Sequence, residues 1–126
     1  VRALDYGDFL LAAPDSAIYN PRTIKHILLT AYRRNKIVIG PTQAYVKAGA
    51  LASSYAPFPE MARVASEFVA TYFATGRLPP PAYPDEYKVE INKQVARSLN
   101  IPLPDREDIA RKVNQQLSNL EEALDE

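Results

Sequence analysis

The sequence predicts an α/β fold: a three-layer, Rossmann-like lobe with a mostly parallel sheet, followed by a helical appendage at the C-terminal end. Two short apolar runs, Asp8–Ala13 and Lys36–Gly40, flank a segment with helical spacing. A longer segment with an unbroken three-four repeat follows between Pro57 and Gly76. Alternation of short apolar runs with helical segments is typical of a parallel sheet covered by helices.

The first half of the chain reads as a strand, a helix and a second strand. The run Asp8–Ala13 is apolar at nearly every position and ends at Pro14, which is typical of a strand buried on both faces of a parallel sheet. Asn20 and Pro21 suit the N-cap and first position of a helix, and Asn35 can end it in a left-handed conformation. Lys36–Gly40 is the second strand, so we expect a right-handed βαβ unit.

The middle of the chain predicts a short helical turn, a third strand and the longest helix. Thr42–Lys47 suits the turn, and Gly49–Tyr55 suits a strand with small side chains. Pro57 and Pro59 introduce the long helix, and Gly76 ends it. Leu78–Pro81 contains three consecutive prolines, which favour an extended connector over a helix or a central strand.

The last part of the chain predicts one strand and two helices. Around Val89, apolar and polar residues alternate as in a strand with one wet face. A short helix follows from about Lys93 to Leu99, with Asn100 placed to end it. Asp105 can cap the final helix. The apolar stripe of that helix consists of Ile109, Val113, Leu117, Leu120 and Leu124.

Composition narrows the function classes. Fifteen basic and fifteen acidic residues cancel, so there is no electrostatic reason to expect a nucleic acid or an anionic membrane as partner. The absence of cysteine excludes disulfides, thiolate metal sites and cysteine nucleophiles. No apolar run approaches the roughly 20 residues that a membrane span requires.

Catalytic and cofactor motifs are missing. The single histidine, His26, lies mid-helix among apolar residues, where a packing or surface role fits better than that of a base. The chain has no His/Cys cluster for a metal, and its four glycines form neither a phosphate loop nor a dinucleotide-binding pattern. We therefore expect no enzymatic activity, no metal and no cofactor.

Polar residues follow the first two predicted strands and mark a candidate ligand site. In an open parallel sheet, ligands bind outside the carboxyl ends of the strands. Asp15 offers a carboxylate for an ammonium or hydroxyl group, and two nearby tyrosines could stack on a ligand. Alternatively, Asp15 and Ser16 only build an Asx turn. The candidate ligand-binding residues are Asp15, Ser16, Tyr19, Thr42, Gln43 and Tyr45.

Four segments, taken in order, resemble the solute-binding proteins of ABC importers, in the group that includes tryptophan- and tyrosine-binding lipoproteins. They are Leu10–Ser16 with Asn20, Tyr45–Ala52, Gly76–Pro80 and Asn92–Leu99. The resemblance implies two Rossmann-like lobes that close on a ligand at a hinge. Residues 1–84 would supply part of the second lobe, and residues 85–126 a hinge-returning strand and the C-terminal helices.

The resemblance also implies a function. A solute-binding protein captures a small solute, here an amino acid or related compound, in the interlobe cleft and delivers it to a membrane permease. It works in the periplasm or as an extracytoplasmic lipoprotein. The alternative is a ligand-sensing domain of the same fold in a signalling protein, and a small flavodoxin-like enzyme is a third reading.

One departure from the family leaves the ligand open. Relatives that bind aromatic amino acids have threonine-aspartate-asparagine where this chain has Pro14-Asp15-Ser16. The chain begins at Val1 rather than methionine, so we expect a cut that removes the first lobe. Either that lobe or a self-association that replaces it would then cover the strand Asp8–Ala13.

Overall fold

The computed structural model describes residues 2–124 and divides them into two compact units. One unit is Ala56–Lys88, and the other comprises the rest of the described chain. The elements, in chain order, are α1 (Ala3–Tyr6), β1 (Phe9–Leu11), α2 (Ile24–Arg33), β2 (Ile37–Ile39), α3 (Gln43–Ala48), β3 (Ala52–Tyr55), α4 (Phe58–Thr75), β4 (Lys88–Ile91), α5 (Lys93–Ser98) and α6 (Arg106–Leu124).

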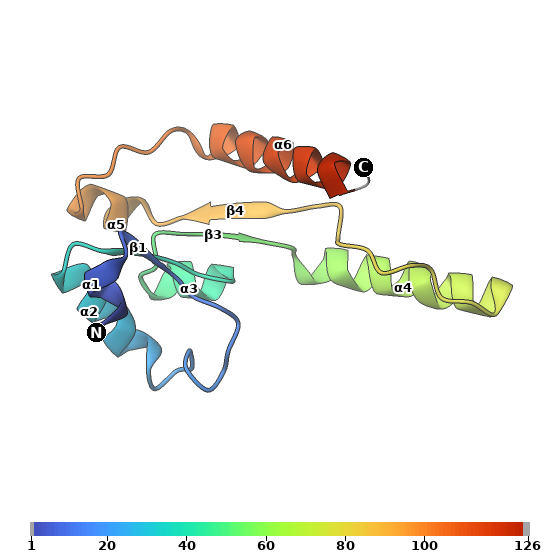
Figure 1. Cartoon of the computed structure of the whole chain (residues 1–126), viewed down its shortest axis with the longest axis horizontal. Helices are drawn as coiled ribbons and strands as arrows, with labels where there is room; N and C mark the ends of the chain where they lie inside the picture. Colours follow the sequence, from blue (N-terminus) through green and yellow to red (C-terminus); the bar gives the residue numbers. More distant parts are fainter. Residues whose placement is uncertain (1, 125–126) are drawn as a thin grey trace. The chain divides into compact units, whose positions relative to one another are not determined.

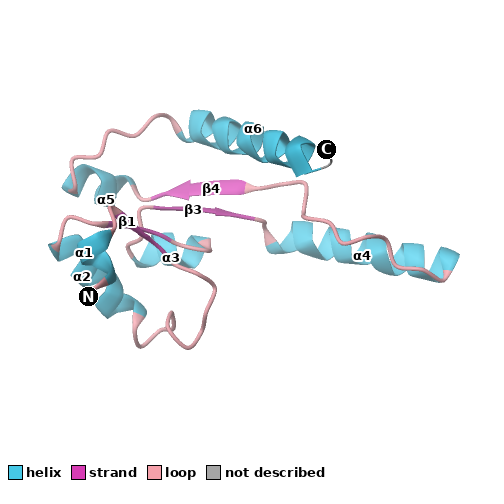
Figure 2. Cartoon of the chain, in the orientation of Figure 1, coloured by secondary structure: helices cyan, strands magenta, loops and turns pink. Residues whose placement is uncertain are grey.

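The four strands form one open, mostly parallel sheet in the order β1-β2-β3-β4. Figure 2 draws the strands in magenta. β1 and β3 both pair in parallel with β2. The amide of Asn92, just after β4, donates to the carbonyl of Leu51, just before β3, at 2.8 Å. The end of β4 therefore lies beside the start of β3, and the two arrows run in opposite directions (Figure 1). The predicted α/β class with a mostly parallel sheet is confirmed.

The predicted βαβ unit is present as β1, α2 and β2, with Leu10 opposite Val38 in the parallel ladder. α2 begins one turn later than expected. The side-chain oxygen of Asn20 accepts the amide of Arg22 at 3.0 Å, so Asn20 caps a turn that leads into the helix. Asn35 ends the unit with a φ of 53°, the left-handed conformation that the sequence predicted.

β1 differs from the expectation of a buried strand. It lies at an edge of the sheet, and Phe9 and Leu11 are 57% and 66% exposed. These two side chains alternate with the half-buried Leu10, so they share one face of the strand. The apolar run predicts the strand correctly, but burial of its side chains depends on what packs on each face of the sheet, and among the described residues the face of Phe9 and Leu11 is left largely uncovered.

The core of the larger unit lies between α2 and the first strands. Leu28 and Ala31 come from α2, Val38 comes from β2, and burying each large aliphatic side chain contributes about 1.5–3 kcal/mol. Tyr19, Ile24 and Tyr45 are partly buried against this cluster. Its fully buried members are Leu4, Ala12, Leu28, Ala31, Val38 and Ala50. The core thus supports the loops that follow β1 and β2.

The C-terminal elements β4, α5 and α6 occur as the sequence predicted. Asn92 caps α5 through its side-chain oxygen, which accepts the amides of Gln94 and Val95 at 3.1 Å each. Asn100 ends that helix in the left-handed region with a φ of 54°. On α6 the predicted stripe is half-buried at Ile109, Val113 and Leu117 and exposed at Leu120. The side chain of Leu124 lies outside the described residues.

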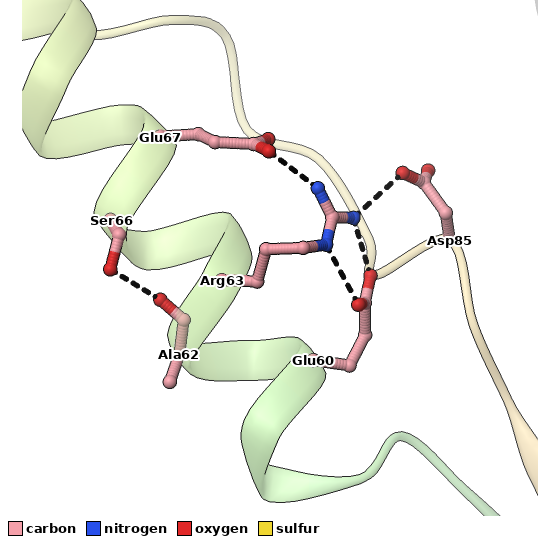
Figure 3. Close-up of polar contacts among 6 residues, drawn as sticks. All are labelled: Glu60, Ala62, Arg63, Ser66, Glu67 and Asp85. Carbon is pink, nitrogen blue, oxygen red and sulfur yellow. Dashed lines mark hydrogen bonds and ion pairs between the residues drawn. The ribbon is translucent and has the colours of Figure 1, made fainter.

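The smaller unit consists of α4 and the return segment, residues 77–87, which runs back along the helix (Figure 1). α4 ends at Gly76, whose φ of 72° is left-handed, as predicted. Arg63 joins the two parts of this unit. Its guanidinium donates to Glu60 at 2.9 and 2.6 Å, to Glu67 at 2.5 Å and to Asp85 of the return segment at 3.2 Å (Figure 3).

Candidate functional site

The loop after β1 is held together by its own side chains. Asp15 lies at its start, and its Oδ1 accepts the amide of Ala17 at 2.8 Å and that of Ile18 at 3.4 Å. The carbonyl of Asp15 accepts the amide of Tyr19 at 2.7 Å. This is an Asx turn, so the structural role considered for Asp15 is present. The turn also fixes the position of Tyr19.

The second half of the same loop is fixed by Asn20 and Thr23. The Asn20 amide group donates to the carbonyl of Ser16 at 3.0 Å, while its oxygen caps the turn that leads into α2. The Thr23 hydroxyl accepts the amide of Asn20 at 3.1 Å. These polar groups therefore have their hydrogen-bond partners within the loop itself.

The loop after β2 is positioned by a close approach between Gly40 and Tyr45. A Cβ on Gly40 would lie 2.4 Å from the Cβ of Tyr45, so only glycine fits at this position. Thr42 is the N-cap of α3 in an extended conformation, and its carbonyl accepts the amide of Tyr45 at 3.1 Å. The tight Gly40 turn therefore brings α3, and with it Tyr45, against the end of β2.

Tyr45 joins the two loops. Its hydroxyl donates to the carbonyl of Tyr19 at 3.2 Å, and both tyrosines are half-buried. Beside this contact lies an open hollow of about 420 Å³ between α2 and α3. Its lining consists of Tyr19, Asn20, Pro21, Ile24, Lys25, Ala44, Tyr45 and Ala48. The hollow is therefore built from the two segments that follow the carboxyl ends of β1 and β2.

The chemistry of this hollow is apolar with one cation. Aliphatic and aromatic side chains cover most of its wall, and Lys25 is the one charged residue in its lining. Asn20 contributes little free hydrogen-bonding capacity, because its amide group and oxygen are engaged within the loop. Such a wall suits an apolar or aromatic group, with a carboxylate directed to the lysine.

The structure brings together two of the six predicted site residues. Tyr19 and Tyr45 share a hydrogen bond and line the same hollow. The other four, Asp15, Ser16, Thr42 and Gln43, lie on the adjoining loops and do not line it. Of these four side chains, Gln43 is half-buried and the other three are exposed. Their role in ligand binding stays a prediction.

Sequence reasoning missed the helical half of the wall. Ile24 and Ala48 line the hollow from α2 and α3, and Lys25 provides its charge. Ile24, Ile27, Leu28 and Ala31 recur at helical spacing, and this apolar stripe predicts packing without marking Ile24 as a site residue. The available signal was the pairing of that stripe with the alanines of the next helix, which becomes visible only when the two helices are known to be in contact.

Two further hollows lie around β4, α5 and the start of α6. Their volumes are about 330 and 350 Å³, and Ile91, Lys93 and Arg106 line both. Arg106 is already engaged, because its Nε donates to the carbonyl of Val89 at 2.8 Å and its Nη2 to Glu90 at 3.3 Å. These hollows have charged walls, unlike the hollow beside Tyr45.

Charged groups of the smaller unit shift one another's pKa values. The pKa of Glu60 is lowered mainly by its hydrogen bonds with Arg63; burial opposes this, and the charge of the same guanidinium lowers the pKa further. The pKa of Arg63 is raised in turn, mainly by its hydrogen bonds with Glu60 and Glu67. This cluster therefore acts as a structural clamp between α4 and the return segment.

Within residues 2–124 no group of three or more histidine, cysteine or acidic side chains is arranged to hold a metal ion. In the same part of the chain, no helix combines the length and hydropathy that crossing a membrane would need.

Comparison with known proteins identifies the fold but no family. No protein-family profile matches the chain, and no curated protein matches it significantly. A solved structure, a conserved domain protein from Vibrio cholerae O1 biovar El Tor strain N16961, is similar with a TM-score of 0.59 and 23% sequence identity. The match covers 82% of this chain and 35% of that one, so the chain spans about a third of the length of its structural neighbour. At this identity the likeness establishes a shared α/β fold alone.

Proposed function

We propose that this chain is the ligand-binding lobe of a solute-binding protein that serves a membrane importer. It captures a small solute at the carboxyl edge of its sheet and presents it to the importer's permease on the outer side of the membrane. The order of the four family-like segments supports this proposal, and so does the α/β fold.

The single observation that carries the proposal is the hollow beside the Tyr19–Tyr45 contact. It is lined by the end of the loop after β1 and by parts of α2 and α3, and parallel α/β sheets bind ligands outside the carboxyl ends of the strands that these segments follow. Its volume of about 420 Å³ falls within the roughly 300–1,000 Å³ that is usual for small-molecule sites. The loops that frame it are held by internal hydrogen bonds, so little ordering is needed when a ligand binds.

The wall chemistry favours an amino acid with an apolar or aromatic side chain. The side chain would lie against Ile24 and the two tyrosine rings, and the carboxylate would face Lys25. Asp15, on the adjoining turn, is the acidic group that could receive the ammonium. Its Oδ1 is occupied by the turn, but its Oδ2 accepts no hydrogen bond from the described residues.

Capture is completed by closure onto a second lobe. One lobe alone leaves the ligand open to water on one side, so its affinity is modest. Contacts from both lobes favour the closed form, and the permease then recognises that form.

Two substitutions at Asp15 separate a binding role from a turn-forming role. Asp15→Asn keeps an oxygen that can accept the amide of Ala17 but removes the charge, whereas Asp15→Ala removes both. If the carboxylate binds an ammonium, both variants weaken amino acid binding about tenfold or more, since a charged hydrogen bond contributes about 1.5–3 kcal/mol. Arg22→Ala, an exposed change on the same loop, is the matched control.

Isothermal titration with a panel of amino acids, together with thermal melting, provides the measurement. Wild-type affinity in Asp15→Asn with a loss in Asp15→Ala would assign Asp15 to the turn alone. No binding of any panel member to the wild-type chain would contradict the proposed function itself.

A further inference from the structure

α4 carries an uncharged apolar surface on its exposed side. At 3.6 residues per turn, the residues concerned fall within about 60° of one line along the helix. This surface, the α4 stripe, consists of Phe58, Met61, Ala62, Ala65, Val69, Tyr72 and Phe73. Phe58 and Phe73 are each 83% exposed, and the rings of Tyr72 and Phe73 meet edge to face with centroids 6.1 Å apart. Contiguous exposed apolar surface of this kind marks an interaction site.

Every charged side chain of α4 lies on the other half of the helix. Glu60, Arg63 and Glu67 are joined to one another and to Asp85 of the return segment (Figure 3). Val64 and Phe68, which are half-buried, lie between this clamp and the stripe. No charge therefore borders the α4 stripe along the helix, and a partner that covers it must itself be uncharged and apolar there.

The stripe is complementary to itself in the antiparallel direction. Within the stripe, the seam positions 58, 62, 65, 69 and 72, continued by Gly76, follow one another at alternating intervals of four and three, the spacing of a two-helix seam, and Met61 and Phe73 lie beside it. When two copies of α4 are placed antiparallel with a two-fold axis at the level of residue 67, larger side chains meet smaller ones. The layers are Phe58 with Gly76, Ala62 with Tyr72, and Ala65 with Val69. An added Cβ at Gly76 would contact nothing within 4 Å, so the outer layer has room for the phenyl ring.

We infer that the α4 stripe is the contact surface for a second copy of this chain, paired antiparallel through α4. Such a two-fold contact places the same patch on both subunits. The positions beside the seam bring no charges together. On one side Ser66 faces Ser66 of the other copy, and on the other side Phe68 faces Phe68 of the other copy. An 18-residue helix is about 27 Å long, so this contact alone is at the small end of stable interfaces. We therefore expect a dimer that forms with rising concentration.

Sedimentation of the 126-residue chain over micromolar to several hundred micromolar concentrations tests the pairing. The wild-type chain should shift from monomer to dimer. Val69→Lys places an unpaired charge in the central layers and should weaken dimerisation about tenfold or more. Ala70→Lys makes the same change in charge on an exposed neighbour that points away from the stripe, and should dimerise like the wild type.

Cross-linking tests the register, and because the chain has no native cysteine, only the introduced thiols can form disulfides. Ala65→Cys and Val69→Cys chains, mixed and oxidised, should form the mixed disulfide in preference to either homodimer, because the antiparallel register places residue 65 beside residue 69 of the other copy. A monomer at all concentrations overturns the inference. So does equal loss in Val69→Lys and Ala70→Lys, or a preference for the 65–65 or 69–69 disulfide.

Discussion

Replacing Gly40 by alanine tests the close approach of Gly40 to Tyr45, because both the sign and the size of the change in unfolding free energy depend on that contact. Gly40 is buried, and its φ is not in the left-handed region, so alanine could adopt the backbone conformation. Without a steric conflict, Gly40→Ala would stabilise the chain by about 0.4–1 kcal/mol by restricting the unfolded state. The conflict is severe, however, because the new Cβ would lie 2.4 Å from the Cβ of Tyr45 and 3.0 Å from its Cγ.

Relief of this conflict requires movement of the backbone. The Cβ of Tyr45 cannot rotate away as the end of a long side chain could, so α3 must shift from β2. Overpacking of this kind costs about 1–3 kcal/mol. We expect Gly40→Ala to lower the free energy of unfolding by that amount and to weaken any ligand binding in the hollow. Urea denaturation followed by circular dichroism measures the change. An unchanged or raised midpoint would show that α3 does not approach β2 as described.

Three further changes test other parts of the fold. Ser53→Ala should be neutral or stabilising by up to about 1 kcal/mol, because the Ser53 hydroxyl is buried without a hydrogen-bond partner among the described residues; a loss in thermal stability would contradict this. Asn92→Ala removes the cap of α5 and the hydrogen bond from the Asn92 side chain to the carbonyl of Val46 at 3.0 Å. The free energy of unfolding, measured by chemical denaturation, should therefore fall by about 1–3 kcal/mol, and an unchanged value would contradict the stabilising role of Asn92. The lowered pKa of Glu60 means that its stabilisation is fully present above pH 4.5 and is lost as the pH falls through the folded-state pKa. The protection factors of the α4 amides should therefore fall below about pH 4.5 in the wild type, and this fall should be weaker in Glu60→Gln.

Most of the element order could be predicted because local chemistry determines it. Asn35, Gly76 and Asn100 end their helices in the left-handed conformation, and each had been identified from its position after a periodic segment. The βαβ unit followed from two apolar runs separated by a helical pattern. In these places the physical cause lies within a few residues of the element itself.

Features that depend on distant residues could not be predicted in the same way. The exposure of Phe9 and Leu11 depends on what covers their face of the sheet, which the apolar run does not reveal. The wall of the hollow combines Ile24 with Ala48, and their proximity results from the packing of two helices. Asp15 lies on the loop after β1, as the sequence predicts, while its role in ligand binding remains a prediction.

The most direct test of the central claim is to map ligand contacts by nuclear magnetic resonance. Amide shifts of the 126-residue chain would be followed during titration with apolar and aromatic amino acids at millimolar concentration. If the hollow binds the solute, saturable shifts will centre on Tyr19, Lys25 and Tyr45, with smaller ones at Asp15. Absence of shifts for every amino acid, or shifts confined to the hollows around Ile91 and Arg106, would contradict a solute site at the carboxyl edge of the sheet.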